Sequence, residues 1–133
     1  MHNSLDKKNE KFSVKKRLKS FEYAFQGIKS FFISTHNARI HLAISVMVII
    51  AAIYFKISLI EWIAVVYAIG LVFTAEAFNT AVEEWVDSIQ PDYDKKAGRV
   101  KDISAGAVLI ASIVAAVIGI LIFGTRFYNL IFN

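Results

Sequence analysis

The 133-residue sequence contains no cysteine and only one proline. Without cysteine, the chain can form neither a disulfide nor a thiolate metal site. The single proline, Pro91, lies in the stretch DSIQPDYDKK, where its ring should end a helix and start a turn. Glycine-rich phosphate loops of the Walker type are also absent, so a nucleotide would have to be bound by another design. The sequence contains no nucleic-acid-binding motif either, and we expect no nucleic-acid partner.

Apolar residues are abundant, at 56% of the chain, and the mean hydropathy of +0.52 exceeds that of a normal small soluble domain. The run ISAGAVLIASIVAAVIGILIF, at 103–123, is free of charge and long enough to cross a hydrocarbon core of roughly 30 Å. Two weaker runs precede it and predict spans at about 38–55 and 57–88. The connection between these two spans is so short that they should form a helical hairpin. The sequence therefore predicts an all-α membrane protein with three transmembrane helices.

The lysines and arginines are unevenly distributed around these spans. One side of the membrane would carry only Lys56 and Arg126. The other side would carry the basic amino-terminal flank and the basic residues of the loop at 88–103, namely Lys95, Lys96, Arg99 and Lys101. Because basic flanks stay in the cytoplasm, we expect a multi-pass protein of the bacterial inner (cytoplasmic) membrane, with its N-terminus and the 88–103 loop in the cytoplasm.

The segment before the first span has apolar residues at helical spacing beside many basic residues. These apolar positions include Phe21, Phe25, Ile28 and Phe32. The pattern predicts an amphipathic helix lying on the membrane surface. A signal peptide is the alternative, but the basic region is too long and no small-residue cleavage site follows. Residues 1–14 are expected to form a polar, disordered terminus, and 15–133 a single domain.

A polar stripe is predicted within AEAFNTAVEEWVD, residues 75–87. On a helix that advances about 100° per residue, its polar members fall within one sector of roughly 100°. These members are Glu76, Asn79, Thr80, Glu83 and Asp87. Acidic groups on a membrane-depth helix are costly, so they usually mark a functional site or a paired, water-lined cavity. The residues alone leave open a catalytic site, a polar seam in an oligomer, and an ion path through a channel or transporter.

The chemistry of the stripe favours a magnesium nucleotide. Carboxylates within a turn or two of each other can coordinate a hard divalent cation, while nearby basic groups neutralise phosphate oxygens. Glu76 lies deepest, among apolar neighbours, where it could accept a proton from a lipid hydroxyl. Glu83, about one helical repeat nearer the water, is better placed as a metal ligand. Lys101 and Asp102 stand at the mouth of the third span at a similar depth, although Asp102 could simply cap that helix.

The stretch EAFNTAVEEWVD followed by PDYDKKAGRVKDISAGAVLI closely resembles the small bacterial integral-membrane diacylglycerol kinases and their undecaprenol kinase relatives. Their pattern is E-x-x-N-[ST]-A-[IV]-E-x-x-V-D, followed by A-K-D or a close variant. The resemblance also covers YAFQGIKSFF and an N-x-R-[IV]-H motif, and extends over roughly 15–123. It implies an ATP-dependent, Mg²⁺-requiring kinase that phosphorylates the primary hydroxyl of a membrane lipid alcohol, either diacylglycerol or undecaprenol. It also implies a homotrimer with active sites between subunits.

The same resemblance implies roles for individual residues. Glu76 matches the catalytic base, Asn79 its polar neighbour at the substrate, and Glu83 a ligand of both metal and nucleotide. Further nucleotide contacts are implied at Lys16, Tyr23, Asp92, Tyr93, Asp94, Lys101 and Asp102. His41, in the N-x-R-I-H motif, is given no role. That motif and the A-G-R-x-K-D segment look more like the undecaprenol kinases, but the choice of lipid stays open.

Two departures from the family pattern concern charge. Thr35 stands where well-known members have a second metal-ligand glutamate, and its hydroxyl can ligate magnesium but cannot supply the missing charge. Lys16 replaces an arginine, which keeps the charge but loses the bidentate phosphate fork. The kinase interpretation is nevertheless preferred to the channel or transporter. A carrier would need polar groups continuing to the outer face, and the third span offers only Ser104 and Ser112.

Overall fold

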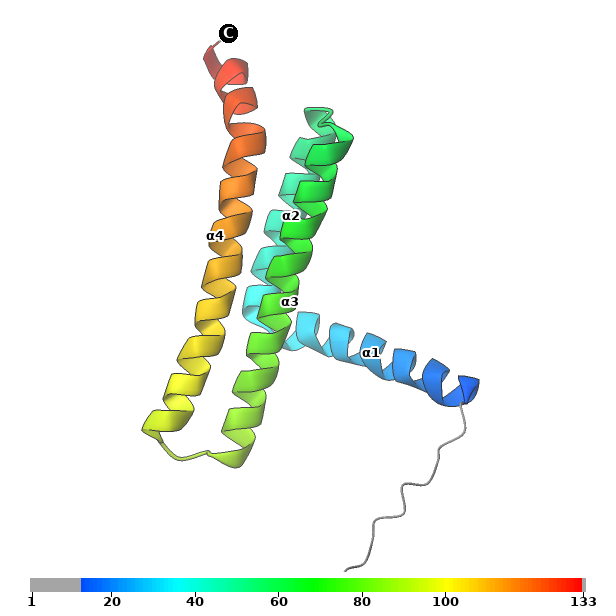
Figure 1. Cartoon of the computed structure of the whole chain (residues 1–133), viewed down its shortest axis with the longest axis vertical. Coiled ribbons are helices and arrows are strands. Elements are labelled where there is room, and N and C mark those ends of the chain that lie inside the picture. The colour runs from blue at the N-terminus through cyan, green and yellow to red at the C-terminus, as the bar shows by residue number, and fades with distance from the viewer. Residues whose placement is uncertain (1–12, 133) are drawn as a thin grey trace, which may run out of the picture. The chain divides into compact units, whose positions relative to one another are not determined.

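The computed structural model describes residues 13–132 and is built of helices, with no strand among those residues. The four helices are α1 (Val14–Ser34), α2 (His36–Tyr54), α3 (Leu59–Ile89) and α4 (Lys95–Phe132) (Figure 1). The all-α prediction is therefore confirmed. The predicted disordered terminus lies outside the described residues up to position 12, and Val14 already belongs to α1. The chain divides into two units, one up to Ser30 and one from Phe31 onwards.

The first unit consists of most of α1. All of its helical residues are exposed, including Phe21 and Phe25. Within the helix, the Lys19 ammonium lies over the Tyr23 ring at 5.7 Å from its centroid. A position on the membrane surface stays a prediction for this helix.

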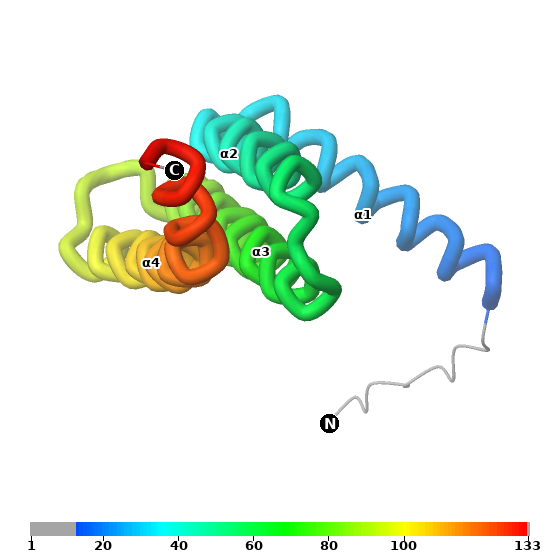
Figure 2. Tube along the Cα trace, turned by 90° about the horizontal axis from the view of Figure 1, so that it is seen from above, coloured from blue at the N-terminus to red at the C-terminus, as the bar shows by residue number. Residues whose placement is uncertain are grey.

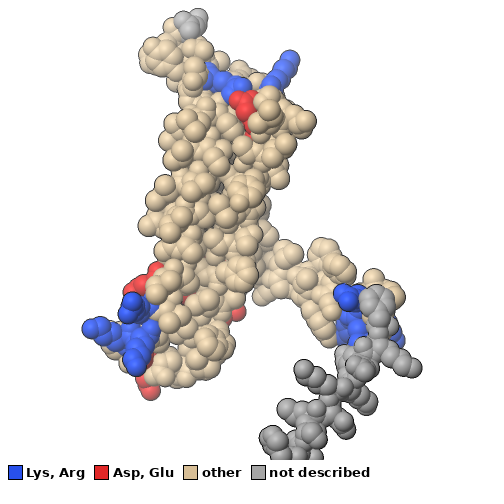
Figure 3. Space-filling model, in the orientation of Figure 1, with Lys and Arg blue, Asp and Glu red and all other residues tan. Residues whose placement is uncertain are grey.

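The second unit contains α2, α3 and α4, each long and apolar enough to cross a membrane. Viewed along the bundle, α3 lies next to both α2 and α4 (Figure 2), and its packing against α4 is the more extensive. Charged side chains gather toward the two ends of this bundle, with uncharged surface between them (Figure 3). The last turn of α1 also belongs to this unit, where Phe32 packs edge-on against Phe73 of α3 at a centroid distance of 5.4 Å.

The α2–α3 hairpin is formed by a tight turn, as predicted from its short connection. Lys56 adopts a positive φ of 49°, which reverses the chain direction after α2. Ser58 then caps α3 through a reciprocal pair of bonds, in which Glu61 N–H donates to Ser58 Oγ at 3.4 Å and Ser58 N–H donates to Glu61 Oε2 at 2.7 Å. Such a capping box satisfies two backbone donors at the start of a helix. The helix bounds agree with the predicted spans 38–55 and 57–88 to within two residues.

The helix that contains the third predicted span is longer than that span. Helix α4 runs for 38 residues, from Lys95 to Phe132, rather than only 103–123. The reason is a local cap, because Asp94 Oδ1 accepts the backbone N–H groups of Lys96 and Ala97, each at 2.8 Å. The expected loop at 88–103 is thereby reduced to residues 90–94, and its basic residues from Lys95 onwards lie on α4. Asp102 consequently lies inside the helix and does not cap it.

The end of the bundle that holds the hairpin turn is closed by apolar packing and one ion pair. Ala52, Val65 and Phe123 belong to a buried cluster, from which rings extend along α4. Beside it, Arg126 donates to both carboxylate oxygens of Glu61, at 2.8 and 3.1 Å. This arrangement fixes α4 to the start of α3 at the end of the bundle opposite the polar stripe.

Candidate active site

The deep part of the polar stripe is buried. Glu76 is 1% exposed and Asn79 is 6% exposed, on the same face of α3 as the buried Val65, Ala68 and Val72. Spacings of three and four residues bring these positions onto one helical face, as the periodicity predicted. Glu76 Oε1 is buried without a hydrogen-bond partner among the described residues. Buried polar atoms are nearly always bonded, so this oxygen calls for a hydrogen-bond donor that the described residues of the chain do not supply.

Asn79 connects Glu83 to α4 through a short hydrogen-bond chain. Its Nδ2 donates to Glu83 Oε1 at 3.2 Å, and its Oδ1 accepts from Ser104 Oγ at 2.6 Å. An ionised carboxylate only accepts hydrogen bonds, so Glu83 selects the amide orientation in which Nδ2 points toward it. The opposite oxygen of the amide then faces Ser104. We therefore place Ser104 in the candidate site, although its position within an apolar span gives no sign of this role in the sequence.

Lys101 and Asp87 form an ion pair between α4 and α3. Lys101 Nζ donates to Asp87 Oδ1 at 2.9 Å and to Oδ2 at 3.0 Å. Lys101 lies before the uncharged run at 103–123. The hydrogen bonds that it donates to Asp87 raise the pKa of the Lys101 ammonium above its ordinary value. The lysine therefore keeps its positive charge throughout the neutral range. The side chains of the pair are partly exposed, so phosphate oxygens can approach the cation.

The end of the stripe from Thr80 to Asp87 opens into a polar cavity of about 350 Å³ at the junction of α1 and α2. From α3 the cavity is lined by Thr80, Glu83, Glu84 and Asp87, and from the junction by Ser34, Thr35, His36 and Asn37. The structure thus brings Thr35, at the position where the resemblance implies a second glutamate ligand, to the same cavity as Glu83 and Asp87. Thr35 precedes α2, but its side chain makes no capping hydrogen bond to that helix. Glu84 also lines this cavity.

The donor set of this cavity fits magnesium held together with a nucleotide. Among the described residues, no group of three or more His, Asp or Glu side chains is arranged to hold a metal ion. Magnesium in nucleotide sites is commonly held by one or two carboxylates together with substrate phosphates, and keeps several waters. Glu83, with Asp87 and the Thr35 hydroxyl nearby, supplies oxygen donors of that kind. The cavity fits a cation that arrives with phosphate and does not form a cage of protein ligands.

The remaining predicted nucleotide contacts are spread more widely. Asp92 and the 94% exposed Tyr93 lie in the short α3–α4 connection, and Asp94 is engaged as the cap of α4. Lys16 and Tyr23 belong to the unit up to Ser30, and their part in nucleotide binding stays a prediction. Asp102 is exposed on α4, one residue after Lys101.

Comparison with known proteins identifies relatives along most of the chain. Residues 22–123 match the family model described as prokaryotic diacylglycerol kinase. The undecaprenol kinase of Bacillus subtilis (strain 168) is 34% identical over 119 residues, which cover 90% of this chain and 97% of the relative. A diacylglycerol kinase of Synechocystis sp. is 38% identical over 103 residues, covering 77% of this chain and 59% of the relative. The diacylglycerol kinase of Escherichia coli (strain K12) is 29% identical over 100 residues, covering 75% and 82%.

Proposed function

This chain belongs to the prokaryotic diacylglycerol kinase family and is a lipid kinase, and we propose that it transfers the γ-phosphoryl group of ATP to the primary hydroxyl of a membrane lipid alcohol. The names of its relatives offer diacylglycerol and undecaprenol as candidates. Both carry a primary hydroxyl, so the same chemistry serves either lipid. We also propose that the site faces the cytoplasm from the bacterial inner membrane. The basic residues from Lys95 to Lys101 lie at the same end of the bundle as the site, and basic flanks usually stay in the cytoplasm.

The observation that carries this proposal is the orphaned carboxylate oxygen of Glu76. An oxygen that is buried and has no partner among residues 13–132 is suited to accept a hydrogen bond, and then a proton, from a substrate hydroxyl. In the proposed step, the lipid oxygen attacks the γ-phosphorus, and the bond from that phosphorus to the β,γ-bridging oxygen breaks. ADP leaves, and the hydroxyl proton passes to Glu76.

The other residues of the site hold and orient the nucleotide. Asn79, fixed between Glu83 and Ser104, keeps the Glu83 carboxylate oriented toward the polar cavity. We propose that Glu83 holds Mg²⁺, which supplies neutralising charge to the phosphate oxygens when bound. Lys101, already cationic beside Asp87, can attract the same phosphates. Nucleotide contacts from Lys16, Tyr23, Asp92, Tyr93, Asp94 and Asp102 remain part of this proposal through the resemblance.

A homotrimer with sites completed between subunits is also part of the proposal. Its support is the family resemblance. The alternative, an ion path through a channel or transporter, has no comparable support. From Glu76 toward the start of α3, the same face of the helix carries Val72, Ala68 and Val65, and these side chains offer an ion no polar groups.

A phosphate-transfer assay with a matched variant tests the proposal. The purified protein in lipid bilayers would receive γ-labelled ATP, Mg²⁺, and either diacylglycerol or undecaprenol, and label in the extracted lipid would be counted. Glu76→Gln should lower kcat by about 100-fold or more while ATP binding is kept, because the amide cannot accept the proton. Glu22→Gln, an exposed substitution on α1, serves as the control. Full activity in Glu76→Gln would remove Glu76 from the role of base, and no label in either lipid would reject the kinase proposal.

A further inference from the structure

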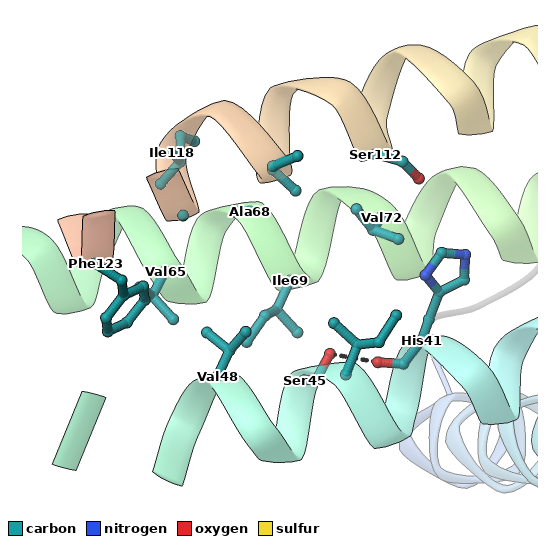
Figure 4. Close-up of a pocket in the computed structure, with 14 residues that line it drawn as sticks. His41, Ser45, Val48, Val65, Ala68, Ile69, Val72, Ser112, Ile118 and Phe123 are labelled. Atoms are coloured by element: carbon teal, nitrogen blue, oxygen red, sulfur yellow. Dashed lines mark hydrogen bonds between the residues drawn. The ribbon is translucent and has the colours of Figure 1, made fainter. Parts of the chain in front are cut away.

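An apolar cavity of about 300 Å³ lies between α2, α3 and α4 (Figure 4). Its walls are almost entirely hydrocarbon, and its polar side chains are His41, Ser45 and Ser112. Ser45 is satisfied, because its hydroxyl donates to the backbone oxygen of His41 at 2.8 Å. Figure 4 shows His41 from α2 and Ser112 from α4 at the end of the cavity where Val72 lies. The cavity therefore has one apolar end and one end with polar groups.

The cavity lies in register with the proposed catalytic base. Helix α3 contributes Val65, Ala68 and Val72 to its wall, and Glu76 follows on the same buried face, one turn after Val72. At 1.5 Å per residue, the distance along the helix from Val65 to Glu76 is roughly 16 Å. The end of the cavity with polar groups is thus the end nearer to the unpaired Glu76 oxygen.

We propose that this cavity binds one hydrocarbon chain of the lipid alcohol and so directs its hydroxyl toward Glu76, an inference that rests on the proposed lipid kinase function. An empty apolar cavity in a packed bundle lowers stability in proportion to its volume, because its lining lacks contacts on one side. The surrounding medium in a membrane consists of apolar chains, which are the chemical class that such walls accept. A charged or strongly hydrated ligand would lose its hydration there without gaining partners.

The size of the cavity limits how much of the lipid enters. A methylene group takes up about as much space as a water molecule in the liquid, roughly 30 Å³, so the cavity holds about ten such groups. That is room for two isoprene units of a polyprenol, or for ten carbons of one acyl chain. The second chain of a diacylglycerol must then stay outside. The shared chemistry is a single chain next to a primary hydroxyl, and an assay with both lipids distinguishes the two sources.

Gly119 of α4 offers a way to fill the cavity without disturbing the protein. It lines the cavity, and a Cβ added at this position meets no atom within 4 Å. Gly124, five residues later on the same helix, is exposed outside the cavity, and its added Cβ makes only an ordinary contact of 3.9 Å with Ile120. Replacing either glycine by leucine raises helix propensity by a similar amount. The two substitutions therefore differ mainly in whether the new side chain occupies the cavity.

The test compares Gly119→Leu with Gly124→Leu in the phosphate-transfer assay, with undecaprenol and diacylglycerol in separate arms. Gly119→Leu should raise the KM of the lipid that uses the cavity by about tenfold or more, while the KM for ATP stays unchanged. Gly124→Leu should leave both constants as in the wild type. Equal lipid KM values for the two variants in both arms would overturn the proposal. A wild type that labels no lipid would instead reject the kinase function itself.

A measurement on the unaltered protein keeps the inference testable if Gly119→Leu fails to fold. A lipid alcohol carrying a photoreactive diazirine about five carbons from its hydroxyl would be cross-linked in bilayers, and the labelled residues identified by mass spectrometry. We expect label on the wall residues Val65, Ala68 and Val72 of α3 or Ser112, Ala115 and Gly119 of α4. Label confined to exposed positions such as Ile110 and Val117 would overturn the proposal.

Discussion

Placing a glutamate at position 35, where the resemblance implies one in related kinases, is the sharpest test of the polar cavity. Thr35 lines it together with Glu83 and Asp87, so Thr35→Glu adds a carboxylate to the proposed magnesium site. Two unit charges 4 Å apart in water interact by about 1 kcal/mol, and a divalent cation therefore gains about 2 kcal/mol from the added charge. Ordering the new side chain offsets about 1 kcal/mol of this gain. The remaining 1 kcal/mol or so corresponds to roughly fivefold tighter magnesium binding.

The assay is a magnesium titration of phosphate transfer at saturating ATP. Thr35→Glu should reach its half-maximal rate at roughly one fifth of the magnesium concentration that the wild type requires. Thr35→Gln, which has the same size without the charge, should match the wild type. Thermal unfolding without ATP gives an independent measurement, because added Mg²⁺ should raise the Tm of Thr35→Glu more than that of Thr35→Gln. Identical magnesium responses in all three proteins would refute the placement of Thr35 beside the metal.

Two further substitutions test the hydrogen bonds that join α3 to α4. Ser104→Ala leaves Asn79 Oδ1 without its donor in a buried position and should cost about 1–3 kcal/mol of unfolding free energy, with a raised KM for ATP that Ser104→Thr restores. An unchanged KM would mean that Ser104 acts only in packing. Arg126→Met breaks the bidentate pair with Glu61 and should lower Tm by a few degrees without altering either KM, since the pair lies at the opposite end of the bundle.

The parts of the structure that depend on local periodicity were predicted well from sequence. Glu76 and Asn79 share a buried face because helical spacing places them there, whatever the helix packs against. The start of α4 was predicted too late, because the hydropathy pattern registers the uncharged run and overlooks the side-chain cap formed by Asp94. A serine followed three residues later by a glutamate, as in the capping box of α3, is a recognisable signal, whereas a lone aspartate before two lysines is a weak one.

The partners of the site residues were less predictable. Ser104 bonds to a residue 25 positions away in the sequence, and a hydroxyl inside an apolar run gives no pattern that indicates such a partner. Lys101 and Asp87 form an ion pair, but the sequence predicted only that they lie at a similar depth in the membrane. The depth of a residue follows from helix length, whereas the direction in which its side chain points depends on how the helices pack. The cavity around Thr35 depends on how α3 packs against the junction of α1 and α2, which one sequence does not specify.

The five-residue connection at 90–94 has a consequence for how a catalytic cycle can proceed. It joins two long helices that are also tied together by Lys101 with Asp87 and by Ser104 with Asn79. A connection this short, together with these two contacts between the helices, leaves the proposed base Glu76 and the proposed phosphate-attracting Lys101 little freedom to move apart. These groups would then move together as one rigid body during the catalytic cycle. Any closure that shields the transferring phosphoryl group from water must therefore come from another segment. The distance between α3 and α4 should stay constant while that segment moves.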